Sequence, residues 1–291
     1  MDYGFCLPNF PAGATGEGIE AAAATSERLG WSTVWTTDHV LVERANARDY
    51  GRIFEAILTL TWVGARHPGL RLGTSVLVVP QRNAVVLAKE LATLDALSGG
   101  RAIAGVGIGW NEAEFANIGA ADRFHVRGAY LDETIRLWRH LWAGSGEPFD
   151  GRFHPLTDYA FEPLPRQGAR LPVWVGGGSV AALRRAGSLG DGWHSSALGP
   201  DAYASRVPAV RAAAEAVGRP MPILSARVRV RFDEAEGSGY ALRGSPEEMA
   251  GDVRAFAALG VEHLALSFGE TEPEAVAAAA DRFAREVAPL A

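Results

Sequence analysis

The chain has 291 residues, of which 48% are hydrophobic and 21% are charged, an ordinary balance for a globular protein with a large core. The net charge of −6 argues against binding to nucleic acids or to an anionic membrane, and no apolar run reaches the ~18 residues of a transmembrane helix. The amino terminus lacks a basic segment before an apolar stretch and Cys6 is the single cysteine, so we expect a cytoplasmic protein without a disulfide framework.

Short segments rich in β-branched residues alternate with helix-like stretches along the whole chain. The extended segments begin at Tyr3, Ser32, Arg71, Arg101, Pro172, Asp191, Ile223 and His263. The helix-like stretches begin near Glu17, Ile53, Ala84, Val126, Ser179, Asp201, Ser245 and Glu272. Because each βα unit returns the chain to the same end of a sheet, the strands are expected to be parallel.

The number of βα units indicates the architecture. Eight units in roughly 250 residues predict an α/β fold of the (β/α)8 TIM-barrel type, with an open doubly wound sheet as the alternative. No long linker divides the chain, so we expect a single domain over residues 1–291. Residues 110–125 follow the fourth strand without a long helix, and residues 143–171 are rich in Gly and Pro. The second stretch is predicted to be an insertion between strands 4 and 5 that can extend along the wall to cover the mouth.

Polar residues stand where the predicted strands end, which is the face that carries function in such barrels. Asp38 and His39 end the second strand, and histidine is suited to proton transfer near neutral pH. A hydrogen-bonded core histidine is the alternative interpretation. His194 ends the sixth strand, where packing is the simpler role.

Two groups of glycines need a physical reason. The turn at Gly176, Gly177, Gly178 and Ser179 precedes a helix, whose amino-terminal amides favour anions, so it indicates a phosphate cradle. A tight turn with positive φ is the alternative. The alternating glycines of residues 105–109 indicate that a flat ligand approaches the strand, or that the barrel packs closely there.

Several other chemistries lack support. Lys89 is the only lysine, and because Glu90 rather than Ser or Thr follows it, the chain has no P-loop motif; its place in a helix-like stretch indicates a solvated residue. The seven histidines are scattered, and no metal site is predicted. No G-x-S-x-G motif is present to suggest a serine hydrolase.

Four stretches together resemble one family. They are "VWTTDHV", "RLGTSVLVVPQRNAVVLAKELATLDALSGGR", "AGVGIGWNEAEFANIG" and "VWVGGGSVAALRRAGSLGDGW". In this order they resemble the luciferase-like monooxygenase superfamily, specifically its branch of oxidoreductases that depend on the deazaflavin coenzyme F420. The resemblance implies a (β/α)8 barrel that holds a flavin or deazaflavin at its carboxyl-terminal face.

The resemblance also implies roles for individual residues. Asp38 and His39 would meet the cofactor head group, with His39 in proton transfer. A non-prolyl cis peptide at Ser75-Val76 would lie behind the ring. The strand that contains Gly107, together with Asn111, would pass beside the cofactor, and Gly177, Gly178 and Ser179 would hold its phosphate.

One departure from the family pattern bears on the substrate. Relatives that oxidise sugar phosphates have a glutamate directly after G-x-G-x-G, where this chain has Trp110, with Glu112 two residues further on as a weaker catalytic candidate. Those relatives also use lysines for the substrate phosphate, which argues against a sugar-phosphate substrate here. The aromatic residues of the same segments suggest an apolar pocket or ordinary packing at the barrel rim: Trp110, Trp35, Trp193 and Phe115.

The leading hypothesis is therefore an F420-dependent oxidoreductase that transfers a hydride between the cofactor and a small organic substrate. An FMN-dependent monooxygenase that uses oxygen is the first alternative, and a non-catalytic flavin-binding protein is the second. A barrel lyase or isomerase acting on phosphorylated metabolites is weakened by the near absence of lysine. Members of the family often form dimers, so a homodimer is one candidate assembly.

Overall fold

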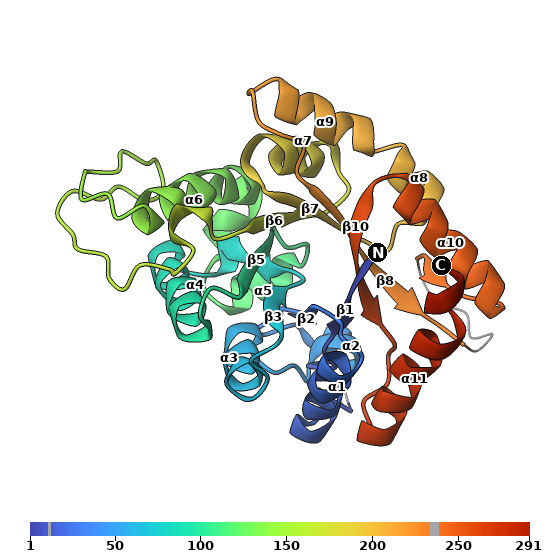
Figure 1. The fold of residues 1–291 in the computed structure, drawn as a ribbon. Coiled ribbons are helices and arrows are strands. Elements are labelled where there is room, and N and C mark those ends of the chain that lie inside the picture. The colour runs from blue at the N-terminus through green and yellow to red at the C-terminus, as the bar shows by residue number, and fades with distance from the viewer. Residues whose placement is uncertain (11–12, 233–238) are drawn as a thin grey trace.

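Parallel strands close into a barrel in the computed structural model, which describes residues 1–10, 13–232 and 239–291 (Figure 1). Neighbours around the wall, in order, are β1 (Asp2–Cys6), β2 (Thr33–Thr36), β3 (Arg71–Thr74) continued by β4 (Leu77–Val78), β5 (Ala102–Gly107), β6 (Val173–Gly176), β7 (Gly192–Ser196), β8 (Ile223–Val230) and β10 (Val261–Ser267). Strand β10 pairs with both β8 and β1, which closes the ring. The short β9 (Ala241–Leu242) pairs with the end of β8. The (β/α)8 prediction is confirmed, and the open sheet is wrong.

Helices cover the outside of the barrel and connect successive strands (Figure 1). The longer ones in the described residues are α1 (Gly16–Arg28), α3 (Ala56–Arg66), α4 (Ala84–Ser98), α6 (Arg127–Trp142), α7 (Val180–Leu189), α9 (Val207–Glu215), α10 (Pro246–Ala258) and α11 (Pro273–Glu286). Short helices add α2 (Ala47–Tyr50), α5 (Glu112–Asn117) and α8 (Pro200–Ala204). Every helix start predicted from the sequence lies within a few residues of an observed one. None of the helices in the described ranges is long and apolar enough to span a membrane.

Local signals explain where several helices begin and end. Ser245 and Glu248 form a capping box at the start of α10. Asn83 accepts the amides of Val85 and Val86 at the start of α4, and Gly99 ends that helix in the left-handed conformation with φ 76°.

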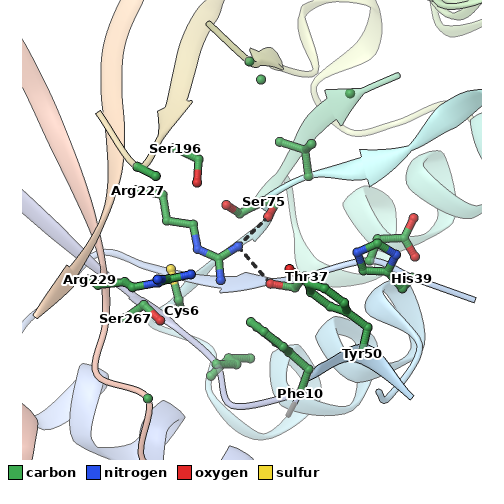
Figure 2. Close-up of a pocket in the computed structure, with 18 of the residues that line it drawn as sticks. Cys6, Phe10, Thr37, His39, Tyr50, Ser75, Ser196, Arg227, Arg229 and Ser267 are labelled. Carbon is green, nitrogen blue, oxygen red and sulfur yellow. Dashed lines mark hydrogen bonds between the residues drawn. The ribbon is translucent and has the colours of Figure 1, made fainter. Parts of the chain in front are cut away.

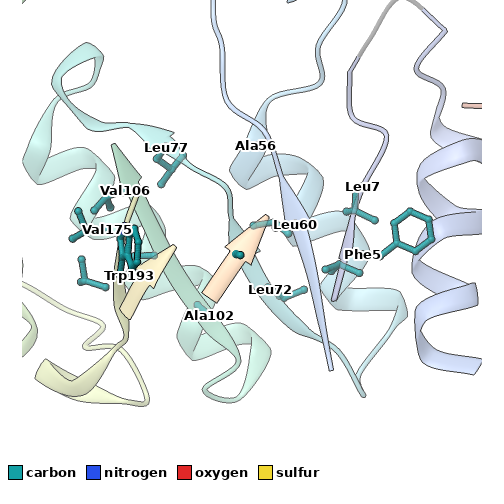
Figure 3. Close-up of a cluster of buried hydrophobic side chains, with 14 of the residues drawn as sticks. Phe5, Leu7, Ala56, Leu60, Leu72, Leu77, Ala102, Val106, Val175 and Trp193 are labelled. Carbon is teal, nitrogen blue, oxygen red and sulfur yellow. The ribbon is translucent and has the colours of Figure 1, made fainter. Parts of the chain in front are cut away.

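The main hydrophobic core fills the space between the barrel wall and the helices (Figure 3). Leu60 of α3 and Leu72 of β3 are fully buried there, as are Val106 of β5 and Val175 of β6. Burial of this kind contributes roughly 1.5–3 kcal/mol for each large aliphatic side chain.

A second, smaller cluster fills the inside of the barrel. Trp35 and Trp174 are buried there with ring centroids 5.3 Å apart. Glycines on neighbouring strands leave room for them, because a Cβ on Gly73 would lie 2.4 Å from the Trp35 ring and one on Gly192 2.6 Å from Trp174. These tryptophans therefore plug the barrel and form the base above which a ligand site can open.

The Gly- and Pro-rich segment 143–171 lies outside the wall, beyond α4 and α6 (Figure 1). Lys89 of α4 donates to the Glu162 carbonyl and lies 4.2 Å from the centre of the Phe161 ring, while the Gln167 amide donates to Asp95 at 2.9 Å. Lys89, expected to be solvated, is thus engaged by this segment. No residue of 143–171, all of which are described, lines the large cavity at the barrel mouth, so the expectation that the segment could cover the mouth is wrong.

Candidate active site

A cavity of about 860 Å³ opens where the parallel strands end (Figure 2). It brings together most of the residues singled out from the sequence, which come from four different strand ends. Those that line it are Asp38, His39, Ser75, Val76, Gly107, Gly176, Gly177 and Ser179. Asn111, Glu112 and Gly178 do not line it.

His39 is held by a residue that the sequence analysis did not single out. Its Nδ1 lies 2.8 Å from Oε2 of Glu114, and the two side chains are 8% and 1% exposed. The other carboxylate oxygen of Glu114 accepts the backbone amides of Val40 at 2.6 Å and Leu41 at 3.2 Å. Nε2 of His39 makes no hydrogen bond with any described residue, and the ring lines the cavity.

The hydrogen bonds to Glu114 decide its charge. Burial raises the pKa of this carboxyl group, but hydrogen bonds from His39 and the Val40 amide outweigh that effect and lower the pKa to about 2. Glu114 is therefore ionised at neutral pH and favours a proton on Nδ1 of His39.

The neighbouring candidates have other roles. Glu112 lies in the same short helix, α5, but its side chain is 66% exposed and pairs with His125 at 3.7 Å. Its position does not support the proton-transfer role considered for it, and we do not retain it. Asn111 is buried as the N-cap of α5, accepting the Glu114 amide, and its side chain donates to Glu43 at 2.7 Å. It therefore positions α5 from behind the cavity wall.

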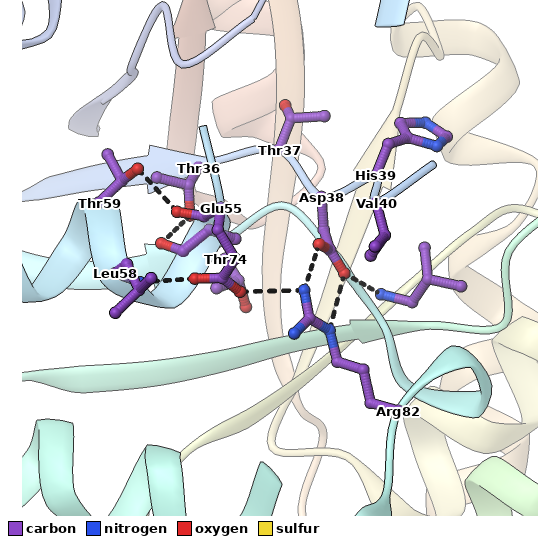
Figure 4. Close-up of polar contacts among 12 residues, drawn as sticks. Thr36, Thr37, Asp38, His39, Val40, Glu55, Leu58, Thr59, Thr74 and Arg82 are labelled. Atoms are coloured by element: carbon purple, nitrogen blue, oxygen red, sulfur yellow. Dashed lines mark hydrogen bonds and ion pairs between the residues drawn. The ribbon is translucent and has the colours of Figure 1, made fainter. Parts of the chain in front are cut away.

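Asp38 is fixed by a buried network behind the cavity (Figure 4). Its carboxylate lies 2.6 Å from Nη2 of Arg82 and accepts the Val78 amide at 2.9 Å, and the side chain is 0% exposed. Arg82 also pairs with Glu55 at 3.0 Å. Burial lowers the pKa of Arg82, but the Asp38 carboxylate outweighs this and raises it. Asp38 thus ties the end of β2 to β4.

The non-prolyl cis peptide expected at Ser75-Val76 is present, between β3 and β4. Ser75 Oγ lies 2.8 Å from Nε2 of His194, whose Nδ1 lies 2.9 Å from Ser225 Oγ. Burial lowers the pKa of His194 well below its usual range, so the ring is neutral and holds the Ser75 hydroxyl from below. The packing role considered for His194 agrees with this position.

The glycines of β5 have a packing reason. A Cβ on Gly105 would lie 1.7 Å from the Thr74 carbonyl oxygen, and one on Gly107 would lie 2.6 Å from Val76. These contacts favour close packing over the other interpretation left open for this strand, the approach of a flat ligand. The irregular segment between β3 and β4 packs directly against the glycines of β5.

The corner after β6 combines a turn with a helix terminus. Gly177 has φ 101°, which only glycine adopts readily, and a Cβ on Gly176 would lie 3.0 Å from Val76. Ser179 caps α7 by accepting the Ala182 amide. The preceding amides of α7 have no intrahelical acceptor and stand at the positive end of the helix dipole.

The aromatic residues divide between the cavity and the core. Trp110, which is 57% exposed, lines the cavity, whereas Trp35, Trp193 and Phe115 are fully buried and do not. For these three the suggestion of pocket-lining residues is wrong. Tyr50 of α2 takes their place, with its ring centroid 4.4 Å from that of His39.

The sequence analysis missed Glu114, which is buried behind His39, and Arg227, which lines the cavity, and each left a faint sequence signal. Glu114 directly precedes the apolar Phe115 in a segment that turns helical, and Arg227 begins the alternating pattern Arg-Val-Arg-Val-Arg on β8. Alternation on a strand places Arg227 and Arg229 on one face, which here is the cavity face.

A family model described as luciferase-like monooxygenase matches residues 1–236. The chain belongs to this family. Among its luciferase-like relatives, an F420-dependent glucose-6-phosphate dehydrogenase of Kineococcus radiotolerans is 32% identical over 226 residues, 77% of this chain and 66% of that one. The enzyme of the same description from Mycolicibacterium fortuitum is 35% identical over 202 residues, 68% and 59% of the two chains. The matched stretch thus spans less than two thirds of these relatives.

Solved structures of low sequence identity share the fold along the whole luciferase-like chain. An F420-dependent tetrahydromethanopterin reductase from Methanopyrus kandleri superposes with a TM-score of 0.81 at 16% identity, covering 99% of this chain and 98% of that one. An F420-dependent secondary alcohol dehydrogenase in complex with an F420-acetone adduct gives 0.83 at 17% identity, covering 100% and 99%. A type II Baeyer-Villiger monooxygenase from Pseudomonas putida, in complex with FMN, gives 0.82 at 14% identity, covering 100% and 98%.

Proposed function

We propose that the protein is an F420-dependent oxidoreductase that transfers a hydride between the deazaflavin and a small organic substrate. The observation that carries the proposal is the placement of His39. Its Nδ1 is bound to the buried Glu114 carboxylate, and its Nε2 is left for a ligand in the cavity. The relatives of this description at 32–35% identity support F420 as the cofactor.

The residues of the cavity fit such a cofactor. A volume of about 860 Å³ lies within the roughly 300–1,000 Å³ usual for ligand and cofactor sites. The floor is the Ser75-Val76 segment, seated between Gly107 and Gly176, neither of which could carry a Cβ without crowding Val76. The corner at Gly177 and the start of α7, whose first amides have no intrahelical acceptor, would suit a phosphate.

When bound, F420 supplies the hydride carrier, and the residues of the chain orient the reactants and handle the proton. The ionised Glu114 accepts a hydrogen bond from the protonated Nδ1 of His39, which leaves Nε2 unprotonated and able to take a proton from a substrate hydroxyl. In the opposite direction the same carboxylate stabilises the imidazolium that donates the proton. Tyr50 and Trp110 lie beside the His39 ring, with ring centroids 4.4 Å and 5.9 Å from it.

The substrate of the named relatives need not be that of this chain. Lys89 lies in α4 and contacts segment 143–171, so no lysine reaches the cavity and arginines would have to supply every charged side-chain contact to a phosphate.

The cofactor assignment is tested by titrating purified protein with F420 and with FMN while following tryptophan fluorescence. We expect F420 to quench at micromolar concentration, and a Trp110→Phe variant to identify the part of the signal that arises at the cavity. Micromolar binding of FMN without a response to F420, with oxygen uptake on reduced FMN, would instead indicate a monooxygenase. Tight binding without turnover on a broad panel of alcohols and ketones would leave a non-catalytic flavin-binding protein.

A further inference from the structure

One guanidinium in the cavity is held on one side only. Nη1 of Arg227 donates to Thr37 Oγ1 and to the Ser75 carbonyl oxygen, both at 2.9 Å (Figure 2). Nε and Nη2 of Arg227 make no hydrogen bond with the described residues, although the side chain lines the cavity. These two N–H groups lie on one edge of the planar group and form the fork that binds a carboxylate or phosphate in a bidentate manner.

The charge of Arg227 has no counterion among the described residues. Two acids line the cavity with it, Asp38 and Glu270. The Asp38 carboxylate is fully buried against Arg82, and Glu270 is exposed and makes no ion pair with Arg227. Arg229 on the same strand and Arg231 just beyond its end also line the cavity. A half-buried cation in such a cavity favours an anionic ligand.

The surroundings of Arg227 suggest the shape of that ligand. The guanidinium lies 5.6 Å from the centre of the Phe10 ring, Phe10 stacks on Tyr50 at 6.1 Å, and Tyr50 contacts His39 at 4.4 Å. The aromatic pair therefore connects the open fork of Arg227 with the proposed proton-transfer residue.

We propose that the substrate is an organic molecule that carries an oxyanion, and that Arg227 is the residue that binds this oxyanion. The apolar or planar body of the substrate lies along Phe10 and Tyr50, which brings its reacting carbon to His39. The assignment of His39 and of the reaction rests on the proposed function, whereas the anion site rests on Arg227 alone.

The test uses benzoate and benzamide as probes, because they have nearly the same shape and differ in charge. Isothermal titration calorimetry is carried out on the full-length protein with and without F420. We expect benzoate to bind at least about tenfold more tightly than benzamide, the scale of a charge-assisted hydrogen-bond pair. Arg227→Gln should abolish this preference, and Arg227→Lys, which keeps the charge but not the fork, should retain part of it. Arg136→Gln removes a charge from the exposed surface of α6 and should leave the preference intact.

Glucose and glucose 6-phosphate form a second probe pair that identifies the source of the oxyanion. A preference for benzoate over benzamide that depends on Arg227 assigns a carboxylate. A preference for glucose 6-phosphate over glucose that depends on Arg227 assigns a phosphate ester. Either result supports the anion site.

Equal binding within both pairs, or a preference that survives in Arg227→Gln, overturns the anion site. So does a variant that loses affinity for F420 while it keeps the preference, since Arg227 would then serve the cofactor. Because the anion preference is also measured without F420, its failure is distinguishable from a failure to bind the cofactor.

Discussion

Glu114 and His39 form a buried pair, with Oε2 of the carboxylate 2.8 Å from Nδ1 of the imidazole. The pair joins the short helix α5 to the end of β2, and the same carboxylate holds two backbone amides after His39. Glu114 is therefore a positioning residue, which fixes the ring and its tautomer while His39 alone faces the cavity.

Replacement of His39 by Ala should reduce kcat by about 10²–10⁴-fold while F420 binding persists, because the proposed proton-transfer group is lost and the cavity remains. Glu114→Gln should have a smaller effect, about tenfold or more, because the ring keeps a hydrogen-bond acceptor but loses the charge that favours its protonated form. Steady-state kinetics with parallel fluorescence titration measures both effects.

The matched control is Glu112→Gln, a change of the same kind two residues away on an exposed side chain. It should leave kcat within about twofold of the wild type. A large loss in this variant would restore Glu112 as a catalytic candidate, and full turnover in His39→Ala would remove the proton-transfer role.

Acid should weaken the fold through Glu114. The pKa of this group is about 2 in the folded protein, below its ordinary value of 4.5, so the ionised form contributes stability at pH above about 4.5. Between about pH 4.5 and pH 2 the unfolded chain takes up the proton first, and this contribution of at most about 3 kcal/mol is lost as the pH falls.

Urea unfolding at pH 6 and pH 3 measures the loss. The free energy of unfolding of Glu114→Gln should depend less on pH than that of the wild type, whereas Glu112→Gln should follow the wild type. Identical pH dependence in Glu114→Gln and the wild type would show that this carboxylate is not the group responsible.

Gly107→Ala should destabilise the protein by about 1–3 kcal/mol, because the added Cβ would lie 2.6 Å from a Val76 methyl in a packed wall. Thermal unfolding measures the change. Addition of Val76→Ala in the same chain should recover part of the loss, since it removes the group that is crowded. Gly146→Ala, where nothing lies within 4 Å of the new Cβ, is the neutral control. A Gly107→Ala variant as stable as the wild type, or a destabilised one in which Val76→Ala recovers nothing, would contradict the packing account.

Gly177→Ala tests the phosphate corner. The φ of 101° at this position is strained for alanine, so the corner should distort at a cost of about 1–3 kcal/mol. Wild-type protein should bind F420 at least about tenfold more tightly than its phosphate-free deazaflavin chromophore, and the variant should bind the two nearly alike. Gly16→Ala, at an open helix start, serves as the control. An equal weakening of both ligands would mean that the corner does not hold the phosphate.

The barrel followed from the sequence because the βα alternation is a local pattern that repeats, and parallel strand ends must meet at one face. That rule also located His39 and the glycine corner. The rule could not find Glu114, which lies on a helix. Residues two apart on a helix differ in direction by roughly 200°, so only the orientation of α5 about its axis decides that Glu112 faces solvent and Glu114 faces His39. Trp35 was misplaced for a related reason, since a ring at a strand end can fill the barrel as well as line its mouth.

Val76 packs against both Gly107 of β5 and Gly176 of β6. A Cβ on either glycine would crowd its methyl groups. Val76 therefore couples the position of the Ser75-Val76 segment, which would support the cofactor ring, to that of the turn at Gly176, which would lead to the phosphate. A sequence that altered either glycine would shift the other contact as well. Adaptation to a cofactor with a different spacing between ring and phosphate would therefore require coordinated substitutions at all three positions.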